Sequence, residues 1–156
     1  MVEISIPGYA KLALQHLVLD YNGTLACDGE LREGVADALR VLAGSLRVHV
    51  VTGDTFGKAR LALAGLPCTL SILPVENQDL GKRSYVEQLG AEQTACIGNG
   101  RNDRLMFEAA ALAVAVVQEE GAAVEALQAA DVVCPDIQSA LNLFRQPLRL
   151  VATLRS

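Results

Sequence analysis

The chain has 156 residues, of which 51% are apolar and 20% charged, and its formal net charge is −5. This length suits one ordinary domain, expected to span residues 1–156, and the composition excludes a disordered or collagen-like protein. The basic residues are scattered, which argues against nucleic acid as a partner, and no apolar stretch reaches the ~18 residues that cross a membrane.

Short apolar runs alternate with longer amphipathic segments along the chain, a pattern typical of a parallel α/β sheet. In the first half, Val2–Ile6 alternates apolar and polar residues and is predicted to be an edge strand. Further strands are predicted within 12–19 and at 48–51, and helices at 35–46 and 56–64.

The second half continues the alternation. Strands are predicted at 70–73, 95–97, 112–117 and 131–133, and helices at 80–89, 103–111, 124–129 and 137–148, where Pro147 kinks or ends the last one. The run at 112–117 is continuously apolar, as expected for a strand buried on both faces. The expected fold class is therefore α/β, three-layer and Rossmann-like, with a mainly parallel central sheet.

Small polar residues follow three of the predicted strands directly. Asp20 follows His16–Leu19, Thr52 follows 48–51, and Asn99 comes one glycine after 95–97. In an open parallel sheet, ligands bind at the carboxyl ends of the strands, so three such residues predict a site at this edge.

The residue types indicate phosphoryl chemistry. A carboxylate such as Asp20 can attack a phosphoryl group and form an aspartyl-phosphate. Two anions repel, so a cation must lie between them, and Mg²⁺ prefers carboxylate oxygens; Asp103 is the second carboxylate. Thr52, the backbone amides near Gly23 or Gly53 and the ammonium group of Lys82 can hold phosphate oxygens.

Four sequence segments carry a family resemblance. They are Asp20-Tyr21-Asn22-Gly23-Thr24-Leu25, Val50-Val51-Thr52-Gly53-Asp54, Lys82 within KRSYVEQLG, and Gly98-Asn99-Gly100-Arg101-Asn102-Asp103. In order and type they resemble the four motifs of the haloacid dehalogenase (HAD) superfamily, and most closely its soluble, P-type ATPase-like phosphatases. The resemblance implies a HAD-like fold and a magnesium-dependent phosphatase.

The resemblance also implies a role for each matching residue. Asp20 would be the nucleophile and a magnesium ligand, and residue 22 would offer its backbone carbonyl to the metal. Thr52 and Lys82 would bind the phosphoryl group, with Gly53 beside them. Asp103 would lie at the metal, directly or through water.

Two residues depart from the family pattern. Asn22 replaces the Asp that protonates the leaving group and then activates water, so a slow enzyme, or one selective for good leaving groups, is expected, because general acid–base catalysis contributes about 10²–10⁴-fold. Asn99 replaces an Asp that ligates the metal, so weaker magnesium binding is expected. The alternative is a catalytically degenerate domain that binds a phosphate-bearing ligand or partner in a regulatory role.

Each candidate also has an ordinary structural interpretation. Asp20 can be a turn residue, Thr52 can cap the following helix, and Asp103 can be a helix N-terminal charge. A lysine near a helix start is usually a solvated surface charge, so Lys82 has Arg83 as a competitor for the phosphate-binding role.

Two further expectations concern assembly and location. The segments after the first and second motifs have room for no cap domain, so the chain resembles the capless branch of the family, whose members often form homo-oligomers; a tetramer is one possibility. The four cysteines form no Cys-x-x-Cys pair and no signal peptide is recognisable, so free thiols in the cytoplasm are expected. The sequence indicates a small phosphorylated substrate without identifying it.

Overall fold

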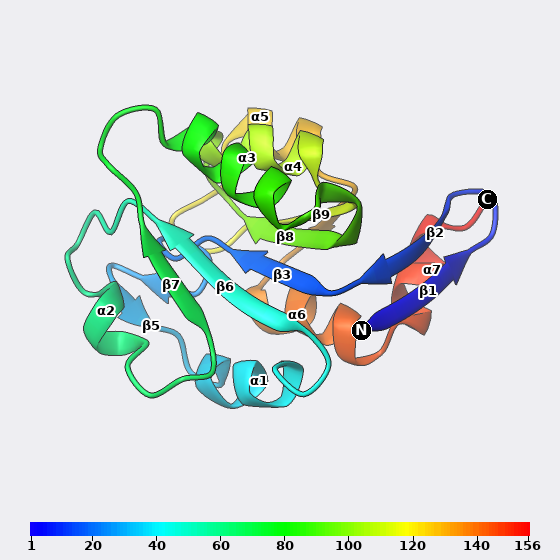
Figure 1. Ribbon diagram of the computed structural model, residues 1–156, viewed down its shortest axis with the longest axis horizontal. Coiled ribbons are helices and arrows are strands. Elements are labelled where there is room, and N and C mark those ends of the chain that lie inside the picture. Colours follow the sequence, from blue (N-terminus) through cyan, green and yellow to red (C-terminus); the bar gives the residue numbers. More distant parts are fainter.

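The computed structural model describes residues 1–156 and is built around a six-stranded parallel sheet with strand order β10-β9-β8-β3-β6-β7 (Figure 1). The strands are β3 (His16–Leu19), β6 (Arg47–Thr52), β7 (Thr69–Ile72), β8 (Thr94–Gly98), β9 (Leu112–Val116) and β10 (Val132–Cys134). The helices are α1 (Val35–Leu42), α2 (Ala59–Ala62), α3 (Gln78–Leu89), α4 (Arg104–Ala109), α5 (Val124–Ala129), α6 (Ile137–Arg145) and α7 (Leu148–Leu154), with 3-10 turns at Ala91–Gln93 and Arg101–Asp103.

Helices cover both faces of the sheet. α3, α4 and α5 lie on one face, and α1 and α6 lie on the other (Figure 1). Two buried apolar clusters, of 31 and 9 residues, fill the two spaces between sheet and helices. All residues of β3, β8 and β9 are buried, which explains their nearly continuous apolar sequence. The predicted three-layer, mainly parallel α/β fold is confirmed.

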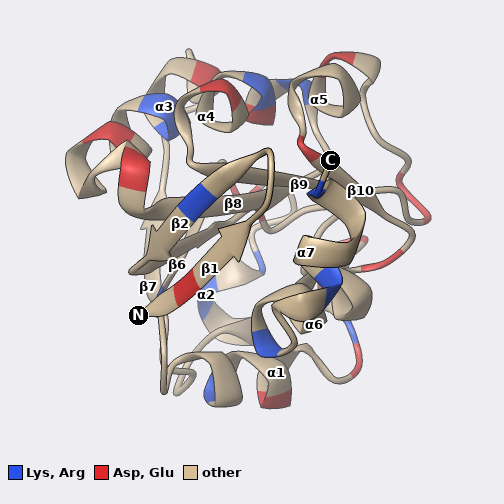
Figure 2. Cartoon of the chain, turned by 90° about the vertical axis from the view of Figure 1, so that its right-hand side faces the viewer, with Lys and Arg blue, Asp and Glu red and all other residues tan.

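The chain begins with a separate antiparallel hairpin of β1 (Val2–Ile6) and β2 (Ala10–Leu14). The strand predicted at Val2–Ile6 is present with these bounds, and it belongs to this hairpin and not to the main sheet. Pro7 and Gly8 turn the chain back on itself, and the hairpin then lies beside α7 (Figures 1 and 2). The apolar run at 12–19 is divided at Gln15 into β2 and β3, because its first half pairs with β1 and its second half with the main sheet.

Several predicted helices differ in extent, and the helix predicted at 35–46 ends at Leu42. The helix predicted at 56–64 is reduced to α2, because the side chain of Asp54 accepts the backbone N–H groups of Lys58 and Ala59 and delays its start. Pro147 ends α6 and opens a new helix, α7, where its missing N–H is tolerated.

No cap domain is present. Between β3 and α1 the chain forms only a small hairpin of β4 (Ala26–Cys27) and β5 (Glu30–Leu31), which no sequence pattern indicated. Between β6 and β7 it forms only α2. The expected absence of a cap is thus confirmed. None of the helices is both long and apolar enough to cross a membrane.

Candidate active site

The predicted site residues follow three adjacent strands at the centre of the sheet. β3 lies between β6 and β8, and Leu19 is in register with Val50 on one side and Ile97 on the other. The backbone N–H of Asp20 donates to the carbonyl of Ile97 at 3.0 Å, which extends the ladder by one residue. Asp20 and the ends of the two neighbouring strands therefore lie together at one edge of the sheet.

A buried ion-pair cluster forms the centre of the site. The ammonium group of Lys82 lies 2.7 Å from Asp20 Oδ1 and 2.7 Å from Asp103 Oδ1. The side chains of Lys82 and Asp103 are 0% exposed and that of Asp20 is 8% exposed. Burial of a charge is costly unless it is paired, and here one cation is shared between two carboxylates.

The sequence left Lys82 and Arg83 as competitors, and their positions on α3 differ. Lys82 lies on the buried face of the helix with Val86, one turn further on. Arg83 points outward, where it pairs with Glu87 on the same helix. Lys82 is therefore the basic residue that the fold brings to Asp20.

The chain wraps closely around Asp103. Its Oδ2 atom accepts the backbone N–H groups of Asn99 and Gly100, at 3.0 and 2.8 Å. A side chain at Gly98 would overlap that same oxygen, so glycine is required there by space rather than by a special backbone angle. The Gly98–Asp103 segment therefore holds the second carboxylate in one orientation.

Thr24 is a site residue to which the sequence assigned no role. Its hydroxyl lies 3.0 Å from Asp20 Oδ2 and 3.3 Å from Asn99 Oδ1, so it links the loops that follow β3 and β8. Gly23 has a φ of 76°, and a side chain there would overlap Asn99. Gly23 and Thr24 both belong to the first motif, and this membership was the sequence feature that could have indicated their role.

Gln118 is a second missed residue, and no sequence pattern pointed to it. Its amide group donates to the carbonyls of Gly23 and Thr24, at 3.1 and 2.9 Å. Its own carbonyl accepts the backbone N–H of Ile137 at the start of α6. Gln118 thus connects the loop after Asp20 to the start of α6, which is far from that loop in the sequence.

The surroundings change the acidity of both partners in the ion pair. Burial, and then the charge of Asp103, raise the pKa of Asp20 to about 6, although Lys82 and Thr24 act against this rise. Burial lowers the pKa of Lys82, but its two carboxylate partners outweigh burial and raise it overall. Asp20 is therefore a weaker acid than an exposed aspartate, and Lys82 holds its proton more firmly than an exposed lysine.

Thr52 and Gly53 lie at the end of the next strand. Thr52 is 1% exposed, and its Oγ1 atom accepts the backbone N–H of Asp54 at 2.9 Å. This bond uses the hydroxyl as an acceptor, which leaves its proton free for another partner. Thr52 does not cap α2, because Asp54 does so. A side chain at Gly53 would overlap Gln78 at the start of α3.

The oxygen atoms around Asp20 suit a magnesium ion. The family resemblance would use the carboxylates of Asp20 and Asp103, the Oδ1 atom of Asn99 and the backbone carbonyl of residue 22 as ligands. Asn22 Oδ1 is buried and accepts no hydrogen bond within the chain, so a further polar group is needed beside it. An all-oxygen donor set with two carboxylates is the kind that Mg²⁺ prefers, so these residues fit the metal.

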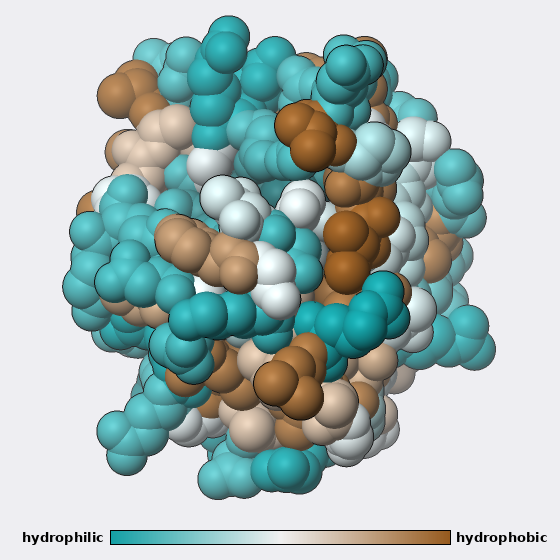
Figure 3. Space-filling view, turned by 90° about the vertical axis from the view of Figure 1, so that its left-hand side faces the viewer, coloured by the Kyte–Doolittle hydropathy of each residue, from teal (hydrophilic) through white to brown (hydrophobic).

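The end of the molecule that carries the site is open. Hydrophilic residues dominate this face, and hydrophobic side chains occur on it in separate patches (Figure 3). A recess of about 360 Å³ lies beside the site, lined mostly by polar residues that include Gln78, Arg101 and Asn102. Asn102 reaches from this recess to the ammonium group of Lys82, at 3.4 Å. There is thus room for a small molecule next to the buried charges.

Comparison with known proteins identifies relatives of the sequence. No protein-family model matches the chain. The uncharacterized protein MJ0073 of Methanocaldococcus jannaschii is 35% identical over 83 residues, which are 51% of this chain and 89% of that protein. The uncharacterized protein MJ0072 of the same organism is 38% identical over 39 residues, 25% of this chain and 89% of that protein. The chain belongs to one family with these archaeal proteins.

Solved structures identify the fold. The cobalt-bound deoxy-D-mannose-octulosonate 8-phosphate phosphatase YrbI of Haemophilus influenzae superposes with a TM-score of 0.71 at 21% identity, over 86% of this chain and 88% of its own. The chain has the HAD fold. The corresponding phosphatase of Moraxella catarrhalis, crystallised with magnesium, phosphate and KDO, has a TM-score of 0.63 at 16% identity and covers 88% of this chain and 93% of its own. A phosphoserine phosphatase matches with a TM-score of 0.62 at 16% identity, over 83% of this chain and 98% of its own.

Proposed function

We propose that this HAD-fold protein is a magnesium-dependent phosphohydrolase that acts on a small phosphorylated substrate through an aspartyl-phosphate. The observation that carries the proposal is the buried cluster in which Lys82 binds both Asp20 and Asp103 at 2.7 Å. A carboxylate placed at a strand end and paired with a fixed cation has the properties of a nucleophile for phosphorus.

In this proposal each residue of the cluster has one task. A carboxylate oxygen of Asp20 attacks phosphorus, while Lys82 and the hydroxyl of Thr52, with Gly53 beside it, bind the phosphoryl oxygens. Asp20, Asp103, Asn99 and the carbonyl of Asn22 would hold magnesium. The bound ion would supply positive charge between the nucleophile and the phosphoryl group.

The solved structures with the same fold support a small substrate. They include phosphatases named for an octulosonate 8-phosphate and for phosphoserine, and one of them contains magnesium and phosphate. Their likeness to this chain lies in the fold, so the identity of its substrate does not follow from them. The turnover is proposed to be slow, because the amide of Asn22 cannot transfer a proton.

The test is hydrolysis of an aryl phosphate, measured with and without magnesium, by the wild-type protein and by Asp20→Asn. The expected result is magnesium-dependent phosphate release by the wild type and none by the variant. Asp37→Asn is the matched control, because Asp37 is exposed on α1 and pairs only with Arg40. Equal inactivity of wild type and Asp20→Asn over a broad panel that includes acyl phosphates would overturn the proposal.

A second candidate is a regulatory domain that binds a phosphate-bearing ligand without turnover. Two amides, Asn22 and Asn99, favour it, since each stands where the HAD motif has a carboxylate. Magnesium titration separates the two candidates by calorimetry and by phosphate release. Tight binding of a phosphate ligand without metal supports the regulatory domain, whereas metal-dependent turnover supports the enzyme.

We also propose that the protein works as a homo-oligomer in the cytoplasm. The open face around the site supports a neighbouring subunit as its cover, with a tetramer as one arrangement. The four cysteines are all free, which suits a reducing compartment. Light scattering that gives the mass of a monomer at working concentrations would remove the oligomer from the proposal.

A further inference from the structure

Gln78 lies at the border of the site, at the first position of α3, and it lines the recess beside the buried charges. Its amide nitrogen occupies the space that a side chain at Gly53 would fill. Gly53 has no positive φ, so glycine is needed there for space and not for a special backbone angle. The amide of Gln78 therefore lies against the loop that is proposed to bind the phosphoryl group.

Two hydrogen bonds determine which end of this amide faces Gly53. The ammonium group of Lys82 can only donate, so the side-chain oxygen of Asn102 faces it, at 3.4 Å. The amide nitrogen of Asn102 then donates to Gln78 Oε1 at 2.9 Å. Gln78 therefore turns its Nε2 group, and not its oxygen, towards Gly53. The three side chains form one chain of hydrogen bonds that runs from the buried ion pairs to the border of the recess.

The N–H groups at the end of this chain have no acceptor within the protein, since the only side-chain hydrogen bond of Gln78 is the one that its oxygen accepts. Lys82 differs in this respect. Its three N–H groups are directed at Asp20, Asp103 and Asn102. A donor that is held in one direction beside an anion needs no reorganisation when the anion binds. Gln78 thus offers a free, oriented donor next to a cation whose own donors are engaged.

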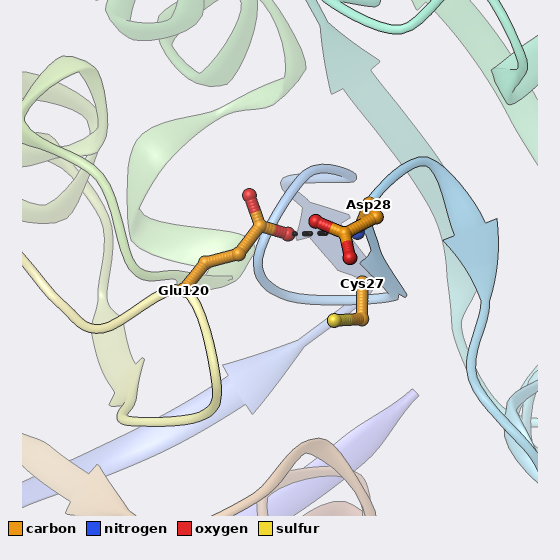
Figure 4. A group of neighbouring side chains, drawn as sticks. All are labelled: Cys27, Asp28 and Glu120. Carbon is orange, nitrogen blue, oxygen red and sulfur yellow. Dashed lines mark hydrogen bonds between the residues drawn. The ribbon is translucent and has the colours of Figure 1, made fainter.

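Another border of the site carries acids instead of donors. Figure 4 shows Cys27 and Asp28 on the β4–β5 hairpin and Glu120 on the loop after β9, and their ligand atoms lie within 4.8 Å of one another. The residue after Glu120 accepts from the side chain of Asn99, so this group adjoins the site. Its two exposed carboxylates repel an anionic phosphoryl group. The recess that Gln78 lines is therefore the more favourable side for phosphoryl oxygens.

We propose that Gln78 binds the substrate directly, by donating a hydrogen bond from Nε2 to a phosphoryl oxygen that lies against Gly53. Asn102 is then a positioning residue, because it holds this amide with its nitrogen towards the phosphoryl group. The inference rests on the proposed phosphohydrolase function. Inorganic phosphate carries the same oxygens as the phosphoryl group, so Gln78 contributes to the binding of the product as well as of the substrate.

The test measures kcat and KM for an aryl phosphate with magnesium, and the affinity for inorganic phosphate by calorimetry, in Gln78→Met and Gln78→Glu. Met has a similar length and no donor. A hydrogen bond to a charged group is worth enough for kcat/KM and phosphate affinity to fall about 10- to 100-fold in Gln78→Met. Glu still accepts the hydrogen bond from Asn102 but turns an anion towards the phosphate, so Gln78→Glu should lose at least as much.

The matched control is Gln88→Met on the same helix. Gln88 is exposed, and its amide donates only to Ser84. Its replacement should leave kcat/KM and phosphate affinity unchanged. The role of Asn102 is tested by Asn102→Ala, alone and combined with Gln78→Met. If Asn102 acts by orienting Gln78, the loss that Asn102→Ala causes should be clearly smaller in the Gln78→Met background than in the wild type.

Each outcome has a distinct meaning. Wild-type kinetics and phosphate affinity in both Gln78 variants overturn the role of Gln78 and leave the phosphohydrolase intact. A loss in Gln78→Met that is absent in Gln78→Glu shows that Gln78 only supports Asn102, which also overturns it. Additive losses in the double variant overturn the positioning role of Asn102.

Failure of the proposed function gives a different pattern. A wild type as inactive as Asp20→Asn overturns the phosphohydrolase, and phosphate calorimetry then decides the role of Gln78 by itself. Weaker phosphate binding in Gln78→Met, with Gln88→Met unchanged, still supports the contact. A wild type that neither turns over the aryl phosphate nor binds inorganic phosphate overturns both proposals.

Discussion

Replacing Lys82 by Met tests whether the buried cluster depends on its one cation. Met keeps an apolar side chain of similar length, so the main loss is the ammonium group and its two 2.7 Å ion pairs. Two buried carboxylates then repel each other without compensation. Removing one partner of a buried ion pair costs about 3–5 kcal/mol, and about 2–4 °C of melting temperature is expected per kcal/mol for a chain of this size, so Tm should fall by roughly 6–20 °C.

The pH dependence of this loss provides a second readout. Without the ammonium group the pKa of Asp20 rises further above its ordinary value of 3.8. A carboxyl group with a raised pKa in the folded state destabilises the fold only when it must ionise, so the loss grows as pH rises through that pKa. Urea unfolding of Lys82→Met in EDTA should therefore show a larger loss at pH 8 than at pH 5.

The matched control is Arg83→Met, one residue along the same helix. Arg83 is 47% exposed and pairs with Glu87, so its replacement should change the free energy of unfolding by less than about 0.5 kcal/mol. If Lys82→Met were no more destabilising than this control, or if its effect did not depend on pH, the assignment of a buried, shared charge to Lys82 would be refuted.

Three other outcomes are expected. Gly98→Ala forces a side chain onto Asp103 and should lower the free energy of unfolding by about 1–3 kcal/mol, whereas Gly44→Ala, whose nearest neighbour would be 3.3 Å away, should not; urea unfolding compares them. Burial lowers the pKa of His49 to about 4, so stability should be complete above about pH 6.5 and fall by roughly 1–2 kcal/mol towards pH 4; replacing His49 by Gln should flatten that part of the profile in pH-dependent urea unfolding. Asn99→Asp adds a carboxylate to the oxygen set and should tighten magnesium binding about tenfold or more in calorimetry; unchanged affinity would place the metal away from residue 99.

Local sequence patterns were sufficient for the central strands and for most helices. β9 is continuously apolar because both of its faces are covered, and α5 has the boundaries that its pattern predicted. The patterns left open which strands pair with each other, because tertiary contacts decide this. Val2–Ile6 has the alternation of any strand with one buried face, and only its pairing with β2 shows that it lies outside the main sheet.

Some residues of the candidate site could likewise be recognised from the sequence, and others only from the structure. Asp20, Thr52 and Asn99 were recognisable because each follows an apolar run, and the carboxyl ends of parallel strands meet at one edge. The choice between Lys82 and Arg83 required the helix to be placed on the sheet, since the two basic residues are adjacent in the sequence. Gln118 lies 94 residues from the Thr24 carbonyl that it contacts, and no local pattern records such a distant contact.

The sequence alone determined which chemical groups this protein carries: an aspartate at the end of a buried strand, glycines where space is short, and amides at residues 22 and 99. It determined them because the covalent order of the chain sets residue type and strand periodicity. Only the tertiary structure decided that one buried ammonium is shared by two carboxylates, and that Arg83 lies outside this cluster. Those facts depend on distances between distant segments, and such distances are fixed only when the helices pack on the sheet.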